Sequence, residues 1–118
     1  MRKTILLVDD SRISRMMIKT IFLQLKSGWH IIEAANSEAA LKLTQNQSFD
    51  IAAVHLKGSG LDGFKLTEKL MIKHPQSDYA LLTDNPQNGV RDKAKKLGFG
   101  LIENPVTEEK IEAFLADC

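Results

Sequence analysis

His55 is the polar residue that closes the apolar run at residues 51–54, and a glycine-rich stretch, residues 58–63, follows it. Open α/β sheets bind ligands just outside the carboxyl ends of such buried strands. An imidazole in that place could bind a metal ion, accept a phosphoryl group or act as a general base. Three further apolar runs end in polar residues, namely Asp9-Asp10, Thr83-Asp84 and Asn104-Pro105.

Apolar runs and amphipathic segments alternate along the chain. Residues 4–8 are a continuous apolar run, as expected for a parallel strand that helices cover on both faces. Ser11 is a good N-cap for the next segment, which has apolar residues at helical spacing and ends near Gly28. These apolar residues are Ile13, Met16, Met17, Ile21 and Leu25. The other predicted strands are residues 29–34, 50–55, 79–83 and 99–102, and the other predicted helices are residues 37–43, 64–74, 90–97 and one that begins at Thr107.

Strands that alternate with helices predict a parallel sheet with helices on both of its faces. Right-handed crossovers and short connections favour a three-layer α/β/α sandwich with the flavodoxin-like strand order 2-1-3-4-5, and the mixed pattern of the second strand indicates an edge. No linker or repeat interrupts the pattern, so residues 1–118 are predicted to form one domain. In this order the polar residues that follow strands one, three, four and five gather at one edge of the sheet.

Composition argues against several classes of function. Lys and Arg number 16 and Asp and Glu number 15, so the net charge of +1 gives no global attraction to nucleic acid or to an anionic membrane. The apolar runs are far shorter than the ~20 residues of a membrane span, and the first residues lack a signal-peptide profile. Cys118 is the single cysteine and cannot form an internal disulfide. We therefore expect a cytoplasmic protein without nucleic-acid or membrane partners.

Four motifs together resemble the receiver domain of bacterial response regulators, across essentially the whole length of the chain. They are the segment Ile5-Leu6-Leu7-Val8-Asp9-Asp10-Ser11, the Gly60-Leu61-Asp62-Gly63 turn, Leu82-Thr83 and Asn104-Pro105. The resemblance implies a role in two-component or phosphorelay signal transduction. It also implies that Asp9 and Asp10 hold Mg²⁺, that the Thr83 hydroxyl contacts a phosphate, and that the bond before Pro105 is cis.

Three positions depart from the pattern of that family. His55 stands where the family has the aspartate that accepts the phosphoryl group, Asn104 stands where it has a lysine, and Leu101 stands at its aromatic switch position. An imidazole forms no acyl phosphate, and an amide carries no charge to pair with phosphate. Asp50 lies roughly 16 Å from His55 at strand rise, and Asp62 belongs to the turn, so neither carboxylate is a good substitute acceptor. The resemblance therefore implies a degenerate receiver without the phosphoaspartate cycle.

The sequence leaves three roles open for His55. Its imidazole could fill the old acceptor site and pair with Asp9 or Asp10, it could accept a phosphoryl group itself, or it could bind a divalent metal. In the last case Asp9 and Asp10, with or without Asp84, would complete an oxygen and nitrogen ligand set better suited to Zn²⁺, Mn²⁺ or Ni²⁺ than to Mg²⁺. Lys57 could place its ammonium among these acids, or it could simply be a solvated loop residue.

We therefore predict a pseudo-receiver, not an enzyme, that acts by protein–protein interaction and needs no cofactor. The alternative is a receiver with a bound divalent metal (Mg²⁺, Mn²⁺ or Zn²⁺) that takes part in a phosphorelay through an atypical site. An enzyme that uses His55 as a general base would need a nucleophile that the sequence does not display. The predicted partner is a histidine kinase, a phosphotransfer protein or an effector. Candidate docking surfaces are the first helix, with Arg12, Arg15, Met16 and Met17, and the face of the fourth helix, fifth strand and fifth helix, which could also form a homodimer.

Overall fold

The computed structural model describes residues 2–57, 61–84 and 88–118. Strands and helices alternate strictly along this described part of the chain, as the sequence predicts. The strands are β1 (Thr4–Val8), β2 (His30–Ala34), β3 (Ile51–His55), β4 (Asp78–Thr83) and β5 (Gly100–Glu103). The helices are α1 (Arg12–Leu25), α2 (Ser37–Leu43), α3 (Leu61–Lys73), α4 (Asn88–Leu97) and α5 (Glu108–Ala116).

The strands form one parallel sheet in the order β2-β1-β3-β4-β5, so the predicted fold class and strand order are confirmed. β2 lies at an edge, as its mixed sequence pattern indicates. Every residue of β3 before His55 is buried, which accounts for the continuous apolar run in that central strand. The carboxyl ends of the parallel strands all lie at the same edge of the sheet.

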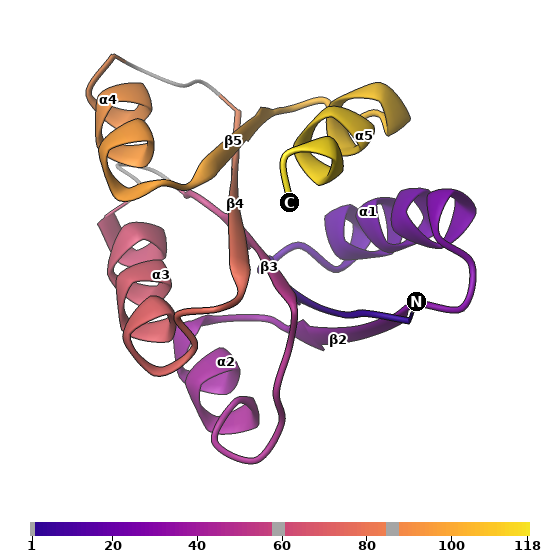
Figure 1. The fold of residues 1–118 in the computed structure, drawn as a ribbon, viewed down its shortest axis with the longest axis horizontal. Coiled ribbons are helices and arrows are strands. Elements are labelled where there is room, and N and C mark those ends of the chain that lie inside the picture. The colour runs from indigo at the N-terminus through magenta and orange to yellow at the C-terminus, as the bar shows by residue number, and fades with distance from the viewer. Residues whose placement is uncertain (1, 58–60, 85–87) are drawn as a thin grey trace.

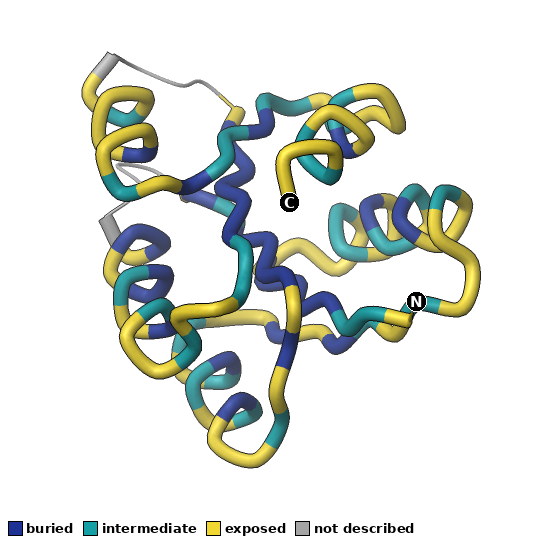
Figure 2. Tube along the Cα trace, viewed as in Figure 1, coloured by how far each residue is buried: buried dark blue, intermediate teal, exposed yellow. Residues whose placement is uncertain are grey.

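Helices cover both faces of the sheet (Figure 1). α1 and α5 lie on one face, where Ile18, Phe22 and Ile111 pack against the sheet, and α2, α3 and α4 lie on the other. Figure 2 shows the buried strands between helices whose outer surfaces are exposed. None of the helices within the described residues is long and apolar enough to cross a membrane.

The apolar residues of α1 do not all face the core. Ile18 and Phe22 are buried, whereas Ile13, Met16 and Met17 are 60–67% exposed, which leaves the two methionines of the candidate docking surface on the outside of the helix. The inward face of the first turn carries the polar residues Ser14 and Arg15 instead, and both contact Asp9. Further along the helix, Ile18, Ile21, Phe22 and Leu25 recur at helical spacing and pack against the sheet.

α3 begins at Leu61, three residues earlier than the predicted start at residue 64. Residues 61–63, which the sequence indicates as a turn, form its first helical turn, and residues 58–60 of the same stretch lie outside the described residues. A Cβ at Gly63 would overlap the Leu56 side chain and would come within 3.3 Å of the His55 carbonyl oxygen. Glycine therefore allows α3 to start directly against the end of β3.

Candidate functional site

The polar residues predicted to gather at the carboxyl edge of the sheet do so. Asp9 and Asp10 follow β1, His55 ends β3, Thr83 ends β4 with Asp84 next, and Asn104 follows β5. Backbone hydrogen bonds extend the ladder past the strand ends, from the Leu56 amide to the Leu82 carbonyl at 2.7 Å and from the Asn104 amide to the Thr83 carbonyl at 2.8 Å. We call the set Asp9, Asp10, His55, Lys57, Thr83, Asp84 and Asn104 the strand-end cluster.

Asp9 is the buried anchor of this cluster, with 2% of its surface exposed. One carboxylate oxygen, Oδ1, accepts a hydrogen bond from the Ser11 amide at 2.9 Å, and the other, Oδ2, accepts one from the Ser14 hydroxyl at 2.5 Å. The Arg15 guanidinium donates to the Asp9 carbonyl oxygen at 2.6 Å. Asp9 therefore fixes the first turn of α1, whose N-cap is Ser11. Sequence reasoning missed the roles of Ser14 and Arg15, since only their helical phase places them beside Asp9.

The His55 imidazole lies between two carboxylates. Its Nδ1 is 3.8 Å from Asp9 Oδ1, and its Nε2 is 3.7 Å from Asp84 Oδ2. Both separations exceed hydrogen-bond distance, although the imidazole side chain is only 15% exposed. Within the described residues Nδ1 is buried and has no hydrogen-bond partner. Such an atom calls for an explanation, because buried polar groups are nearly always paired.

Lys57 reaches across the cluster and donates a hydrogen bond to Asp10 Oδ2. This hydrogen bond lowers the pKa of the Asp10 carboxyl below its ordinary value and raises the pKa of the Lys57 ammonium. Both side chains are largely exposed, yet the ammonium lies among the acids. The sequence left Lys57 either solvated or placed among the acids. In the structure it pairs with Asp10.

Asn104 completes the cluster from β5. Its Nδ2 donates to Asp84 Oδ1 at 2.5 Å, and its bond to Pro105 is cis, as the resemblance implies. Leu101 is half-buried and packs against the apolar cluster on the face of α2, α3 and α4. Asp84 is 73% exposed, so Asn104 holds a carboxylate at the solvent rim of the site.

Of the other acids and histidines that the sequence offers, Asp62 lines the same cavity as His55, whereas Asp50, His30 and His74 lie elsewhere. Asp50 Oδ2 accepts a hydrogen bond from the Thr4 amide, at the amino ends of β1 and β3. Asp62 is exposed in the first turn of α3, where the helix dipole favours a carboxylate. His74 packs against the Phe49 ring, and His30 is exposed on β2.

A cavity of about 340 Å³ opens beside the cluster. Asp9, Asp10, His55 and Lys57 line it, and it extends over the first turn of α3 to the loop before α2. One ligand atom each from Asp9, Asp10 and His55 lie within 4.8 Å of one another, the spacing of a metal-binding group. These donors do not suit Mg²⁺, which takes oxygen ligands in a nearly ideal octahedron, because one donor is an imidazole and the Lys57 ammonium is bonded to Asp10.

The family model for the response regulator receiver domain matches residues 5–116. The chain belongs to this family. This receiver is 34% identical over 101 residues to response regulator GtcR of Aneurinibacillus migulanus, a match that covers 86% of the chain and 39% of that protein. It is 31% identical over 107 residues to a cyclic di-GMP phosphodiesterase of Thermotoga maritima, covering 90% of the chain and 28% of that protein. The receiver thus spans well under half the length of these curated relatives.

Solved receivers have the same fold. A receiver domain protein from Methanospirillum hungatei superposes with a TM-score of 0.84 at 23% identity, covering 99% of this chain and 93% of that one. A Burkholderia pseudomallei response regulator, solved with a phosphorylated aspartic acid and a calcium ion, gives a TM-score of 0.79 at 26% identity and covers 96% of this chain and 66% of that one.

Proposed function

We propose that this receiver has lost aspartyl phosphorylation and acts in bacterial signalling through protein–protein contacts alone. The observation that carries the proposal is the imidazole of His55 at the end of β3, flanked by Asp9 and Asp84. In the family, that strand ends in the aspartate that accepts the phosphoryl group. The Burkholderia relative, with its phosphorylated aspartic acid, illustrates the chemistry that a carboxylate permits and an imidazole does not.

The charges of the strand-end cluster support a site that functions without Mg²⁺. Lys57 supplies a positive charge to Asp10, which in the family would share a metal ion with Asp9. Asn104, in place of the lysine of the family, bonds to Asp84 and supplies no charge for a phosphate. Leu101 packs on the core without the hydroxyl or large ring of the family's switch residue. We infer a domain that is either held in one receiver state or controlled by the abundance of its partner instead of by phosphate.

We further propose that residues 1–118 form one non-enzymatic domain in the cytoplasm, and that its partner is a histidine kinase, a phosphotransfer protein or an effector. Two matched relatives are named as a sensor kinase, LuxN of Vibrio harveyi, and a response regulator, GtcR. Both names support a place in two-component signalling. Both proteins are longer than this chain.

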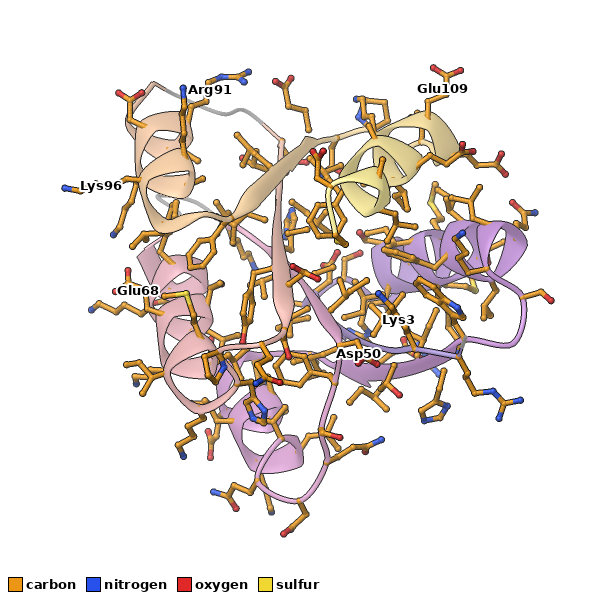
Figure 3. All side chains as sticks on the ribbon, viewed as in Figure 1. Lys3, Asp50, Glu68, Arg91, Lys96 and Glu109 are labelled. Atoms are coloured by element: carbon orange, nitrogen blue, oxygen red, sulfur yellow. The ribbon has the colours of Figure 1, made fainter. Side chains whose placement is uncertain are left out.

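The face formed by α4, β5 and α5 is the proposed docking or homodimer surface. Figure 3 shows Arg91 on α4 and Glu109 on α5 pointing outward from this face. Part of its charge is already paired within the chain, because Arg91 bonds to Glu103 and the Lys110 ammonium donates to the carbonyl oxygens of Glu103 and Pro105. The acids of α5 and the lysines Lys95 and Lys96 of α4 remain exposed, so we propose that this surface favours a partner with complementary charges of both signs.

The second candidate function is a phosphorelay step through an atypical site, in which His55 itself carries the phosphoryl group. The cavity beside His55 favours it, since a small phosphodonor could reach the imidazole there. An enzyme with His55 as general base has less support, because no Ser, Thr or Cys hydroxyl or thiol is bonded to the imidazole within the described residues.

Incubation with acetyl phosphate and Mg²⁺, followed by intact-mass measurement, tests the proposal. We expect the mass to remain that of the unmodified chain. A stoichiometric phosphoryl adduct that disappears in His55→Ala would instead establish the second candidate function. An adduct that persists in His55→Ala would place phosphorylation on another residue, and peptide mapping would identify it.

A further inference from the structure

We propose that Asp9, Asp10 and His55 form a binding site for a borderline transition-metal ion such as Zn²⁺, and that this site discriminates against Mg²⁺. In this site the Asp84 carboxylate orients the His55 ring. The Lys57 ammonium competes with the metal ion for Asp10. The inference goes beyond the proposed function, which needs no metal, and it does not depend on whether the protein can be phosphorylated.

The unpaired Nδ1 of His55 is the first reason for this assignment. Nδ1 is buried, has no hydrogen-bond partner among the described residues, and points toward Asp9 Oδ1 at 3.8 Å. Two ligand atoms that share a tetrahedral ion at ~2.1 Å lie roughly 3.4 Å apart. The two atoms therefore need to approach by only a few tenths of an ångström to bind one ion. A metal would pair the nitrogen that the protein itself leaves without a partner.

The other side of the ring supplies the second reason. A histidine that binds a metal usually donates its remaining N–H to a carboxylate, which fixes both the tautomer and the orientation of the ring. Nε2 of His55 faces Asp84 Oδ2 at 3.7 Å, and Asp84 is held in turn by the amide of Asn104 at 2.5 Å. The order Asn104, Asp84, His55 and metal is that of a carboxylate–histidine–metal arrangement, which Nε2 and Asp84 Oδ2 complete once they approach to hydrogen-bond distance. In this arrangement Asp84 does not touch the ion.

Asp9 can accept the ion without losing its present contacts, whereas Asp10 exchanges its bond to Lys57 for the ion. Asp9 Oδ1 and Oδ2 each accept one hydrogen bond, and a carboxylate oxygen has a second lone pair for a metal. A ligand atom of Asp10 lies within 4.8 Å of the other two donors. Asp10 and its partner Lys57 are exposed, so the Lys57 side chain can move into solvent when an ion replaces the ammonium. Two carboxylates and one imidazole leave room for water as a fourth ligand.

The donor set explains the expected selectivity. Mg²⁺ gives up its water shell reluctantly and prefers oxygen ligands, whereas imidazole suits Zn²⁺, Co²⁺ and Ni²⁺. Replacing a carboxylate by His55 removes one negative charge, which weakens binding of Mg²⁺, and adds a nitrogen donor, which favours the transition metals. The selectivity therefore follows from the residue that abolishes the phosphoacceptor.

Calorimetric titration of the whole chain with Zn²⁺, in a large excess of Mg²⁺ and without phosphodonor, tests the proposal, and the absorption spectrum of bound Co²⁺ reports nitrogen ligation. We expect one equivalent of Zn²⁺ to bind despite the Mg²⁺. We expect this binding to be lost in His55→Gln and in Asp10→Asn, the second being a substitution at an exposed position. His30→Ala is the matched control, because His30 is an exposed histidine on β2, and it should bind as the wild type does.

Two further variants separate the proposed roles. Asp84→Asn should weaken Zn²⁺ binding about 10–100-fold, the usual cost of losing the outer partner of a ligating histidine. Lys57→Met should tighten it, because the competing ammonium is gone. The absence of Zn²⁺ binding, its displacement by Mg²⁺, or equal binding by wild type and His55→Gln would overturn the proposal. Unchanged affinity in Lys57→Met would overturn the assignment of Lys57 as competitor.

Discussion

The ammonium of Lys57, two residues beyond the end of β3, donates a hydrogen bond to the carboxylate of Asp10, two residues beyond the end of β1. Forty-seven residues separate the two in sequence, and the pairing of β1 with β3 brings them together. The pair places a cation of the protein itself beside an acid that in other receivers serves a metal ion. Because the ammonium of Lys57 is bonded to Asp10, this site differs from one in which Asp10 binds Mg²⁺.

Replacing Lys57 by methionine should return the pKa of the Asp10 carboxyl toward its ordinary value of 3.8, because the hydrogen bond from the ammonium is what lowers it. A group whose folded pKa is lowered adds stability above its unfolded pKa and loses it as the pH falls through the folded value. In the wild type this loss should therefore begin below pH 3.8. Carbon-detected NMR titration of the Asp10 carboxyl measures both variants, and coincident midpoints would contradict the pairing.

The buried face of α1 can be tested by two substitutions five residues apart. Phe22→Ala should lower the free energy of unfolding by about 3–5 kcal/mol, because it removes a core ring that is 1% exposed. Met17→Ala, on the outer face at 60% exposure, should change it by no more than about 0.5 kcal/mol. Denaturant unfolding gives both values. Comparable losses would mean that Met17 packs in the core, which would contradict its exposed position.

Tyr79, the single tyrosine of the chain, is predicted to ionise late. Burial raises the pKa of its phenol from 10.0 to about 12. The folded state therefore favours the neutral phenol, and its contribution to stability is present below pH 10 and is lost as the pH rises toward about 12. Absorbance of the phenolate should give a midpoint near 12 in the folded protein and near 10 in urea. Tyr79→Phe, which should show no such change, is the control; a folded midpoint near 10 would refute the prediction.

Much of the fold follows from the sequence alone, because the central strands are continuous apolar runs and the helix caps Ser11 and Thr107 stand where α1 and α5 begin. The convergence of Asp9, His55 and Asn104 follows equally, since parallel strands end at one edge. The contacts of Ser14 and Arg15 with Asp9 could not be predicted, because apolar spacing marks the inward face of α1 only from Ile18 onward. The start of α3 could not be predicted either, since Gly63 serves the close approach of the helix to Leu56 and does not break it.

The finer geometry of the site also lay beyond the sequence. Nothing in the spacing distinguishes a solvated Lys57 from one that pairs with Asp10, because that choice depends on the path of the loop after β3. The placement of Asp84 on the Nε2 side of His55, opposite Asp9, likewise depends on the staggered ends of β3 and β4. These contacts decide whether the cluster resembles a metal ligand set or a group of internally paired charges.

The measurement that tests the central claim most directly is phosphorylation of the wild type beside the double variant His55→Asp/Asn104→Lys. Both proteins are incubated with acetyl phosphate and Mg²⁺, and their intact masses are compared. If the scaffold is that of a receiver and the losses are confined to these positions, the double variant should gain one phosphoryl group and the wild type none. A phosphoryl adduct on the wild type would contradict the account, and an unmodified double variant would show that the site has diverged beyond these two residues.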